Sequence, residues 1–176
     1  MPRTLLLIAF SSLAFAQQYA KDGNLVLPKD YREWVFLSSG YATDYNAMGA
    51  NNPNLFHNVF VNPAAHKSFL RTGTWPDKTV MILELRKSEN KSSINREGFV
   101  QTGIAAIEVH VKDSAKGGWA FYGFGGDAKT GKPFPKTADC FSCHQQNGAT
   151  DTTFVQFYPT LIDIANQHGN FKETSH

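Results

Sequence analysis

The sequence has little net charge, few cysteines and no long apolar run. Its 17 basic residues nearly balance its 15 acidic ones, which leaves a formal net charge of +2. Nothing in this balance favours binding to nucleic acid or to an anionic membrane surface, because both require a clear basic excess. Internal repeats and low-complexity linkers are also absent, so the chain is expected to form one ordinary domain.

The only sustained apolar stretch lies at the N-terminus. Arg3 precedes an apolar run at residues 5–10, and Ala14-Phe15-Ala16 has the small-residue pattern of a signal-peptidase site. The stretch is short for a transmembrane span, although an uncleaved anchor is the alternative. The sequence therefore predicts a secretory signal peptide at residues 1–16 and a single domain at residues 17–176, with no membrane attachment after cleavage.

The two cysteines lie close together in Cys140-Phe141-Ser142-Cys143-His144. C-x-x-C-H is the attachment signature of a c-type haem, in which two thiols add to the vinyl groups and the histidine ligates the iron. The motif predicts one covalently attached haem c, held by Cys140 and Cys143, with His144 as the axial iron ligand. Bacterial haem c is attached outside the cytoplasmic membrane, so an exported, periplasmic protein is expected.

Two other interpretations of the motif remain. A C-x-x-C pair in an exported protein is compatible with a structural disulfide or a thioredoxin-like redox pair, but redox pairs usually open a helix early in a βαβ unit. A zinc site is the other alternative, and it is weaker because two cysteines and one histidine lack a fourth ligand at a local spacing.

The hydrophobic pattern of the domain predicts an α+β fold, a mostly antiparallel β-sheet with short helices packed at its ends. Ile107, Val109 and Val111 alternate with Glu108, His110 and Lys112, a period typical of a half-buried strand. Strands are expected at 56–61, 80–86, 99–112 and 119–124, helices at 29–37, 63–71 and 160–167, loops at 38–53, with room for a short strand, and at 125–135, and a short helical turn at the C-x-x-C-H motif.

This order of segments resembles the cytochrome P460 family, which includes the beta-sheet cytochromes c′. The resemblance spans nearly all of the mature chain. It is carried by Pro28-Lys29-Asp30-Tyr31-Arg32-Glu33-Trp34, Val59-Phe60-Val61-Asn62-Pro63-Ala64-Ala65, Trp75-Pro76-Asp77-Lys78-Thr79, Val111-Lys112-Asp113-Ser114, Gly117-Gly118-Trp119, the C-x-x-C-H motif with Gln145-Gln146, and the segment from Asp151 to Pro159, which ends in Gln156-Phe157-Tyr158-Pro159.

The resemblance implies one haem on a mostly antiparallel β fold, often in a homodimer, with His144 proximal and the distal side open to diatomic gases and small nitrogen species. The P460 enzymes oxidise hydroxylamine and carry a bond from a lysine to the haem macrocycle, whereas the cytochrome c′-beta relatives lack that bond and bind gases such as nitric oxide. Leu83 stands where the lysine is expected, and the nearest lysines are Lys78 and Lys87. The departure favours gas binding over hydroxylamine oxidation, and leaves open whether the protein is an enzyme acting on hydroxylamine or nitric oxide.

Several residues are candidates for the distal pocket. Met81 and Leu83 are expected on an apolar strand face, and Phe56 and Phe60 share a face of their strand, where they either cap the pocket or belong to the core. Glu84 is a candidate proton relay beside a bound ligand, with pairing to Arg86 as its simpler role.

A third hypothesis is an electron-transfer cytochrome with a sixth protein ligand. Met48, in a loop rich in glycine and asparagine, is a candidate for that ligand. His57, His66, His110 and His168 are interpreted as ordinary strand or surface histidines. A redox partner protein and a homodimer are the macromolecular partners expected.

Overall fold

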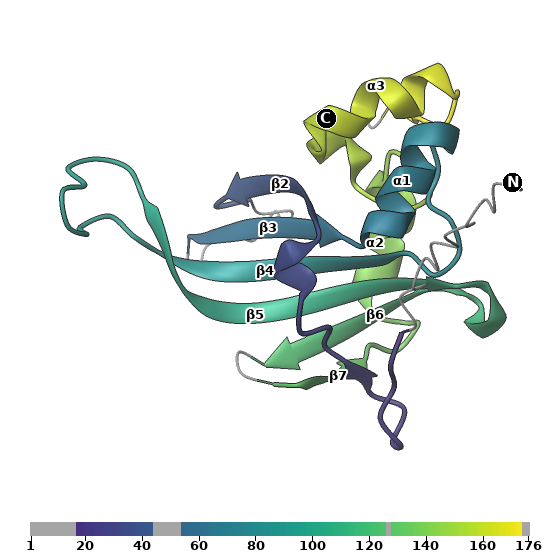
Figure 1. Cartoon of the computed structure of the whole chain (residues 1–176), viewed down its shortest axis with the longest axis horizontal. Coiled ribbons are helices and arrows are strands. Elements are labelled where there is room, and N and C mark those ends of the chain that lie inside the picture. The colour runs from purple at the N-terminus through teal and green to yellow at the C-terminus, as the bar shows by residue number, and fades with distance from the viewer. Residues whose placement is uncertain (1–16, 44–53, 126–127, 174–176) are drawn as a thin grey trace, which may run out of the picture.

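Seven antiparallel strands form one sheet in the computed structural model, which describes residues 17–43, 54–125 and 128–173. The spatial order is β1-β7-β6-β5-β4-β3-β2, so β1 and β2 are the edges (Figure 1). The strands are β1 (Leu25–Val26), β2 (Val35–Tyr41), β3 (Leu55–Val61), β4 (Val80–Glu89), β5 (Val100–Asp113), β6 (Gly118–Gly125) and β7 (Thr130–Pro133). This architecture confirms the predicted α+β fold.

The register of the central strands defines two faces of the sheet. Met81 of β4 lies opposite His110 of β5, which in turn lies opposite Phe121 of β6. Directly opposed residues share a face, because side chains alternate along each strand. We call the face that carries Met81, Leu83, His110 and Phe121 the motif face. Val80, Ile82 and Glu84 point to the other side, which we call the opposite face.

Each face is covered by its own apolar cluster. On the opposite face, Tyr31 and Trp34 pack with Val80, Ile82 and Val109. On the motif face, Val61 and Met81 pack against the helices α1 (Pro63–Thr72) and α3 (Pro159–Gln167). The largest side chains of this second cluster that are fully buried include Phe69, Trp75 and Leu161. A sheet covered on both faces explains why β4 begins with three consecutive buried residues.

Two of the three helices expected from the sequence are present, and proline and glycine residues mark their ends. Pro63 begins α1, and Gly73 ends it in a left-handed conformation with φ of 66°. Asn62 occupies the N-cap position, but its side chain accepts a hydrogen bond from the backbone N–H of Val80 at 2.8 Å instead of capping the helix. Pro159 begins α3 as expected.

The helix predicted at residues 29–37 is wrong. Only Tyr31–Glu33 form a single 3-10 turn, η1, and β2 begins at Val35 because Val35 and Phe36 pair with Val61 and Phe60 of β3. Tertiary pairing of β-branched and aromatic residues overrides the local helical pattern here. The loop predicted at 125–135 also contains β7, whose Lys132 and Pro133 pair with β6.

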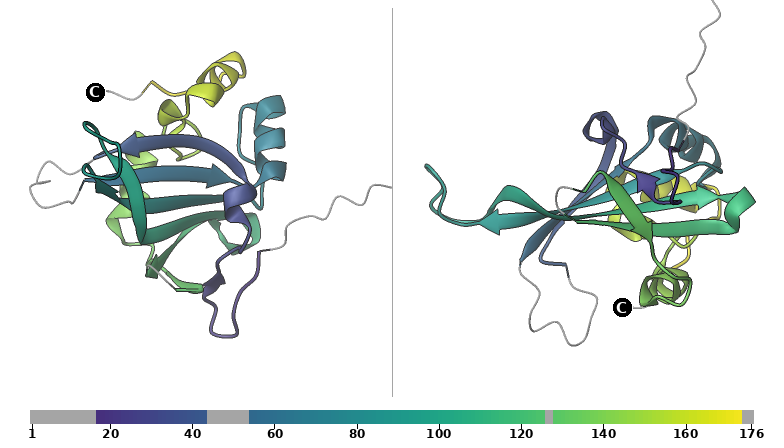
Figure 2. Two further views of the ribbon diagram at one scale, coloured as in Figure 1. Left: turned by 60° about the vertical axis from the view of Figure 1, so that its left-hand side comes forward. Right: turned by 90° about the horizontal axis from the view of Figure 1, so that it is seen from below.

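The helical elements occupy different sides of the sheet. Figure 1 shows η1 in front of the central strands and α2 (Asp139–Asn147) behind them. The connection between β4 and β5 extends well beyond the rest of the sheet (Figure 2). Among the described residues, no helix has the length and hydropathy needed to cross a membrane.

Candidate functional site

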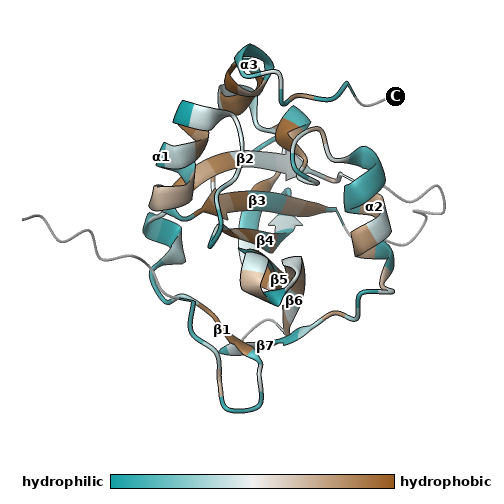
Figure 3. Ribbon diagram, turned by 90° about the vertical axis from the view of Figure 1, so that its right-hand side faces the viewer, coloured by the Kyte–Doolittle hydropathy of each residue, from teal (hydrophilic) through white to brown (hydrophobic). Residues whose placement is uncertain are grey.

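Helix α2 presents the C-x-x-C-H motif to the sheet. Figure 3 views the sheet end-on and shows α2 to one side of it, apart from α1 and α3. Cys140 and Cys143 lie three residues apart, so they occupy neighbouring positions on the helix surface. Both are half-buried free thiols and they do not form a disulfide. His144 follows directly and is 9% exposed.

The hydrogen bond to the imidazole of His144 determines which of its nitrogens is free. Nδ1 lies 2.8 Å from the backbone carbonyl oxygen of Thr152, and a carbonyl oxygen only accepts. Nδ1 therefore carries the proton and donates it, which leaves the lone pair on Nε2. Burial lowers the pKa of His144, although the bond to Thr152 opposes this effect. A neutral imidazole with a free Nε2 is the form that ligates iron.

Three rings surround the imidazole of His144. Its centroid lies 4.7 Å from that of His110, 4.8 Å from Phe121 and 4.3 Å from Phe154. Phe121 also contacts His110 and, at 4.5 Å, Phe141 of α2, so that the helix is packed onto β5 and β6 through aromatic rings. Burial, with the neighbouring His144, holds the pKa of His110 well below its usual value.

These contacts change the interpretation of β5. The sequence predicts Glu108 and His110 on the solvated side of a half-buried strand, and His110 as an ordinary strand histidine. Both instead lie on the motif face, where α2 covers His110. The strand pattern alone shows that these residues share a face, but only the position of α2 shows that the face is covered.

Glu108 lies close to the first cysteine of the motif. Burial raises the pKa of Cys140, and the negative charges of Glu108 and Asp139 add to the effect. Burial also raises the pKa of Glu108, with no other cause. Glu108 lies opposite Leu83 of β4 and opposite Gly123 of β6. The motif face near Cys140 therefore carries the half-buried carboxyl group of Glu108.

The candidate distal residues separate into two groups, and Met81 and Leu83 belong to the first. Both lie on the motif face. Met81 is 3% exposed and packs in the core cluster with Phe69 and Trp75. Leu83 is half-buried and belongs to neither core cluster. It lies between Val59 of β3 and Glu108 of β5, so it is free of the core packing that occupies Met81.

Phe56, Phe60 and Glu84 form the second group, which the structure does not bring to His144. Phe60 lies opposite Ile82 and packs edge-on against Tyr31 at 5.8 Å and Phe36 at 5.7 Å. Phe56 lies opposite Arg86 and contacts Tyr41 at 4.8 Å. The three side chains belong to the opposite face, with the sheet between them and the motif. Phe60 therefore packs against the sheet core, the second of the two roles open to it from the sequence.

Glu84 is the centre of a buried polar network. It is 1% exposed, and it accepts hydrogen bonds from the Tyr31 hydroxyl, from Arg86 Nε and from Arg32 Nε and Nη2, the last two at 2.9 and 2.6 Å. Burial alone would raise the pKa of this carboxyl, but the hydrogen bonds from Tyr31, Arg86 and Arg32 together lower it. Pairing with Arg86, the simpler role expected for Glu84, is what the structure shows.

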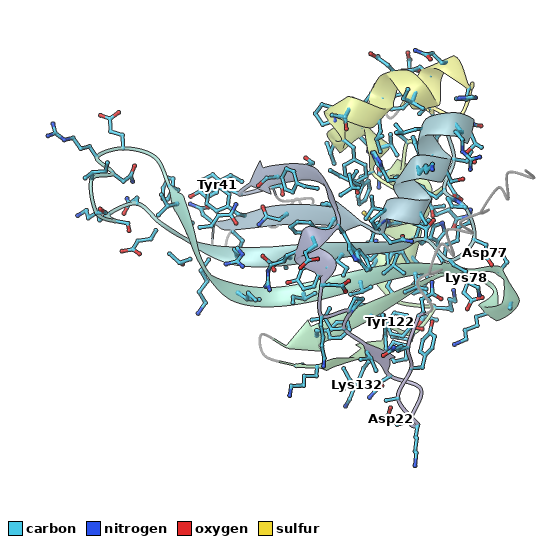
Figure 4. All side chains as sticks on the ribbon, viewed as in Figure 1. Asp22, Tyr41, Asp77, Lys78, Tyr122 and Lys132 are labelled. Carbon is cyan, nitrogen blue, oxygen red and sulfur yellow. The ribbon has the colours of Figure 1, made fainter. Side chains whose placement is uncertain are left out.

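The nearest lysines lie away from the motif face or are exposed. Lys78 donates to Asp113 at 2.6 Å, and Asp113 is buried on the opposite face with Val109 and Val111. Figure 4 shows Lys78 beside Asp77 at the turn before β4. Lys87 is exposed, four positions beyond Leu83 on β4.

The remaining candidate ligands are distant or outside the described residues. Met48 lies outside them, as do residues 1–16. His57 is hydrogen-bonded to the Thr43 hydroxyl at 2.9 Å in an exposed position, and His66 lies on α1. Within residues 17–43, 54–125 and 128–173, no three His, Cys, Asp or Glu side chains gather closely enough to hold a metal ion by themselves.

The donor set therefore fits a haem better than a bare metal. Two free thiols one turn apart and a neutral imidazole whose lone pair is on Nε2 are the groups that covalent haem attachment requires. The zinc alternative lacks a fourth ligand among the described residues. The chain matches the family model described as Cytochrome P460 over residues 28–155, which cover most of its length. No curated protein matches it.

Proposed function

The chain belongs to the cytochrome P460 family, and we propose that it is a mono-haem c-type cytochrome that binds small neutral gases at an open haem face. Cys140 and Cys143 hold the haem through thioether bonds and His144 is its proximal ligand. When bound, the haem supplies an iron with one coordination position left for nitric oxide or carbon monoxide. The protein orients the proximal imidazole through the Thr152 carbonyl.

Leu83 is the observation that carries the choice of gas binding. It stands where the lysine of the hydroxylamine-oxidising relatives is expected, on the face of the sheet that α2 covers. Val59 and Leu85 are apolar and half-buried like Leu83, and they lie on the same face of the sheet. Glu108, which lies opposite Leu83, is itself half-buried, and burial raises its pKa. Apolar surroundings favour neutral diatomic ligands over charged or strongly hydrated ones.

Hydroxylamine oxidation is the second candidate, since the family contains enzymes of that kind. It requires a lysine amine at the macrocycle. The ammonium group of Lys78 is paired with Asp113 on the opposite face, which argues against its use as a substitute. The electron-transfer alternative depends on a sixth ligand, and Met48, its candidate, lies outside the described residues.

The optical spectrum of the purified ferrous protein separates the three functions. We expect a five-coordinate haem whose spectrum changes on addition of carbon monoxide, and a tryptic haem peptide without a second peptide attached. A red-shifted Soret band, with Lys78 or Lys87 linked to the haem by mass spectrometry, would establish the hydroxylamine-oxidising type. A six-coordinate low-spin spectrum would establish the electron carrier.

A matched pair of variants tests the part assigned to Leu83. A tryptophan at this position would fill space beside the haem, so L83W is expected to slow carbon monoxide association by steric exclusion. The control is L70W, because Leu70 lies exposed on α1. Equal association rates in the two variants would show that Leu83 does not contact the ligand side.

Export and dimerisation are part of the same proposal. A signal peptide at residues 1–16 would direct the chain to the bacterial periplasm, where haem c is attached. The edge strand β2 supports a homodimer, because no other strand of the described residues pairs with its outer side, and Phe36 on this strand is 53% exposed. A redox partner protein would deliver the electron that keeps the iron ferrous.

A further inference from the structure

We propose that Asp151, held by Lys112, is a positioning residue that fixes the Thr152 carbonyl on the proximal histidine and so sets the reduction potential. The inference rests on the proposed haem attachment. It goes beyond that function because it assigns a role to an ion pair that touches neither the motif nor the distal candidates.

The segment that carries the Thr152 carbonyl is a strained turn. Thr150 and Thr153 form an isolated antiparallel bridge, and the residues between them, Asp151 and Thr152, have φ of 48° and 58°. Positive φ at both central residues is the requirement of a type I′ turn, which normally selects asparagine and glycine. Threonine is β-branched and strongly disfavours this conformation, so the surroundings must hold the turn in place.

Three side chains hold the turn by hydrogen bonds: Lys112, Trp75 and Trp119, whose Nε1 donates to Asp151 Oδ1 at 3.4 Å. Lys112 Nζ donates to Asp151 Oδ2 at 2.6 Å and to the Trp75 backbone carbonyl at 2.7 Å. The indole Nε1 of Trp75, which is 1% exposed, donates to Thr153 Oγ1 at 2.8 Å. Lys112 is on β5, two positions from His110 on the motif face. The strand that contacts the ring of His144 therefore also anchors the turn whose carbonyl accepts from its Nδ1.

This arrangement has a consequence for the iron. A strong hydrogen bond from Nδ1 raises the basicity of a ligating imidazole and favours the ferric state, and it also fixes the ring orientation. Release of Asp151 would let the turn relax towards a less strained conformation and move the Thr152 carbonyl away from Nδ1. The iron–histidine bond would weaken and the reduction potential would rise.

The chain offers a matched control for this pair. Lys78 forms an ion pair with Asp113 at the same distance of 2.6 Å, near the same end of the sheet, but on its opposite face. K112M keeps the aliphatic stem and removes the charge that holds Asp151, and K78M does the same for Asp113. D151A removes the carboxylate, whereas D151N retains a side-chain acceptor in a residue that tolerates positive φ.

The experiment measures haem content first, then the midpoint potential and the iron–histidine stretching frequency of the ferrous protein by resonance Raman spectroscopy. Absence of haem from the wild-type protein would refute the proposed function itself. We expect K112M and D151A to lower the stretching frequency and to shift the oxidised-to-reduced ratio up to about tenfold, which is 59 mV for one electron. K78M and D151N should change the ratio less than twofold.

Equal potentials and stretching frequencies in K112M, D151A and K78M would overturn the proposal. If K112M folds by circular dichroism but takes up less haem than K78M, the result supports a positioning role in the apoprotein. If K112M fails to fold while K78M folds, the pair is a structural element only and the proposal is wrong.

Discussion

Substitution of Glu84 by glutamine should destabilise the protein without affecting its haem. Glutamine has the size of glutamate and still accepts from Tyr31, but it removes the charge that pairs with Arg32 and Arg86. The side chain of Arg32 is 48% exposed, so its pair contributes about 0–1 kcal/mol. That of Arg86 is 26% exposed, and its charged hydrogen bond contributes about 1.5–3 kcal/mol. We expect E84Q to lower the free energy of unfolding by about 2–3 kcal/mol.

The pH dependence provides a second test of the same substitution. The hydrogen bonds to Glu84 hold its pKa in the folded protein below the unfolded value of about 4.3. The stabilisation is therefore fully present above that value and is lost as the pH falls through the folded pKa. The difference between wild type and E84Q should be constant near neutral pH and shrink below about pH 4.

The assay is urea unfolding followed by far-UV circular dichroism, at pH 7 and at pH 3.5, with optical spectra recorded on the same samples. E89Q is the control, because Glu89 is exposed at the far end of β4 and its change should stay within about 0.5 kcal/mol. The reasoning is refuted if E84Q matches E89Q in stability. It is also refuted if E84Q alters the ferrous spectrum or carbon monoxide affinity, since Glu84 would then act on the motif face.

The other predictions concern the haem and the oligomer. C140S or C143S should weaken or abolish covalent attachment, so that acid-acetone extracts haem from the denatured variant but not from the wild type; haem release from the wild type would contradict attachment. H144A should abolish the native coordination, whereas H110A should keep a five-coordinate iron; a spectrum changed equally by both would favour bis-histidine ligation. Sedimentation at micromolar concentration should show a dimer, and F36E should weaken it; a wild-type monomer would exclude the β2 edge as an interface.

The sequence predicts those elements whose signals are local. Pro63 and Gly73 bound α1 because each suits one helix end, and the apolar residues at the start of residues 80–86 predict the buried strand β4. The C-x-x-C-H motif is local in the same sense, since three functional groups fit within five residues of one helix. Predictions failed where partners distant in sequence decide the outcome. Residues 35–37 read as helical until β3 pairs with them, and β7 exists because it adds to β6.

The site beyond the motif depends on which face of the sheet α2 covers, and this is a long-range property. Alternation along β4 shows that Leu83 and Glu84 point in opposite directions, but it does not show which of them meets His144. The aromatic contacts of His110 and Phe121 with His144 decide the question. Thr152 and Phe154 carry no recognisable signal, because their roles arise from a turn that returns to the helix eight to ten residues after the motif.

Glu84 of β4 and Glu108 of β5 lie on opposite faces of the sheet, and their surroundings shift their pKa values in opposite directions. Glu84 and Glu108 are both withdrawn from solvent, yet hydrogen bonds from Tyr31 and two arginines lower the pKa of Glu84, whereas burial raises that of Glu108. A carboxylate whose acceptor sites are filled by charged donors is suited to holding a structure together and poorly suited to proton transfer. The carboxyl group of Glu108 lies opposite Leu83 and near Cys140, and its burial favours the protonated form. If a proton relay serves a ligand in this protein, the residue to change is Glu108, and E108Q is expected to alter the pH dependence of ligand binding while E84Q does not.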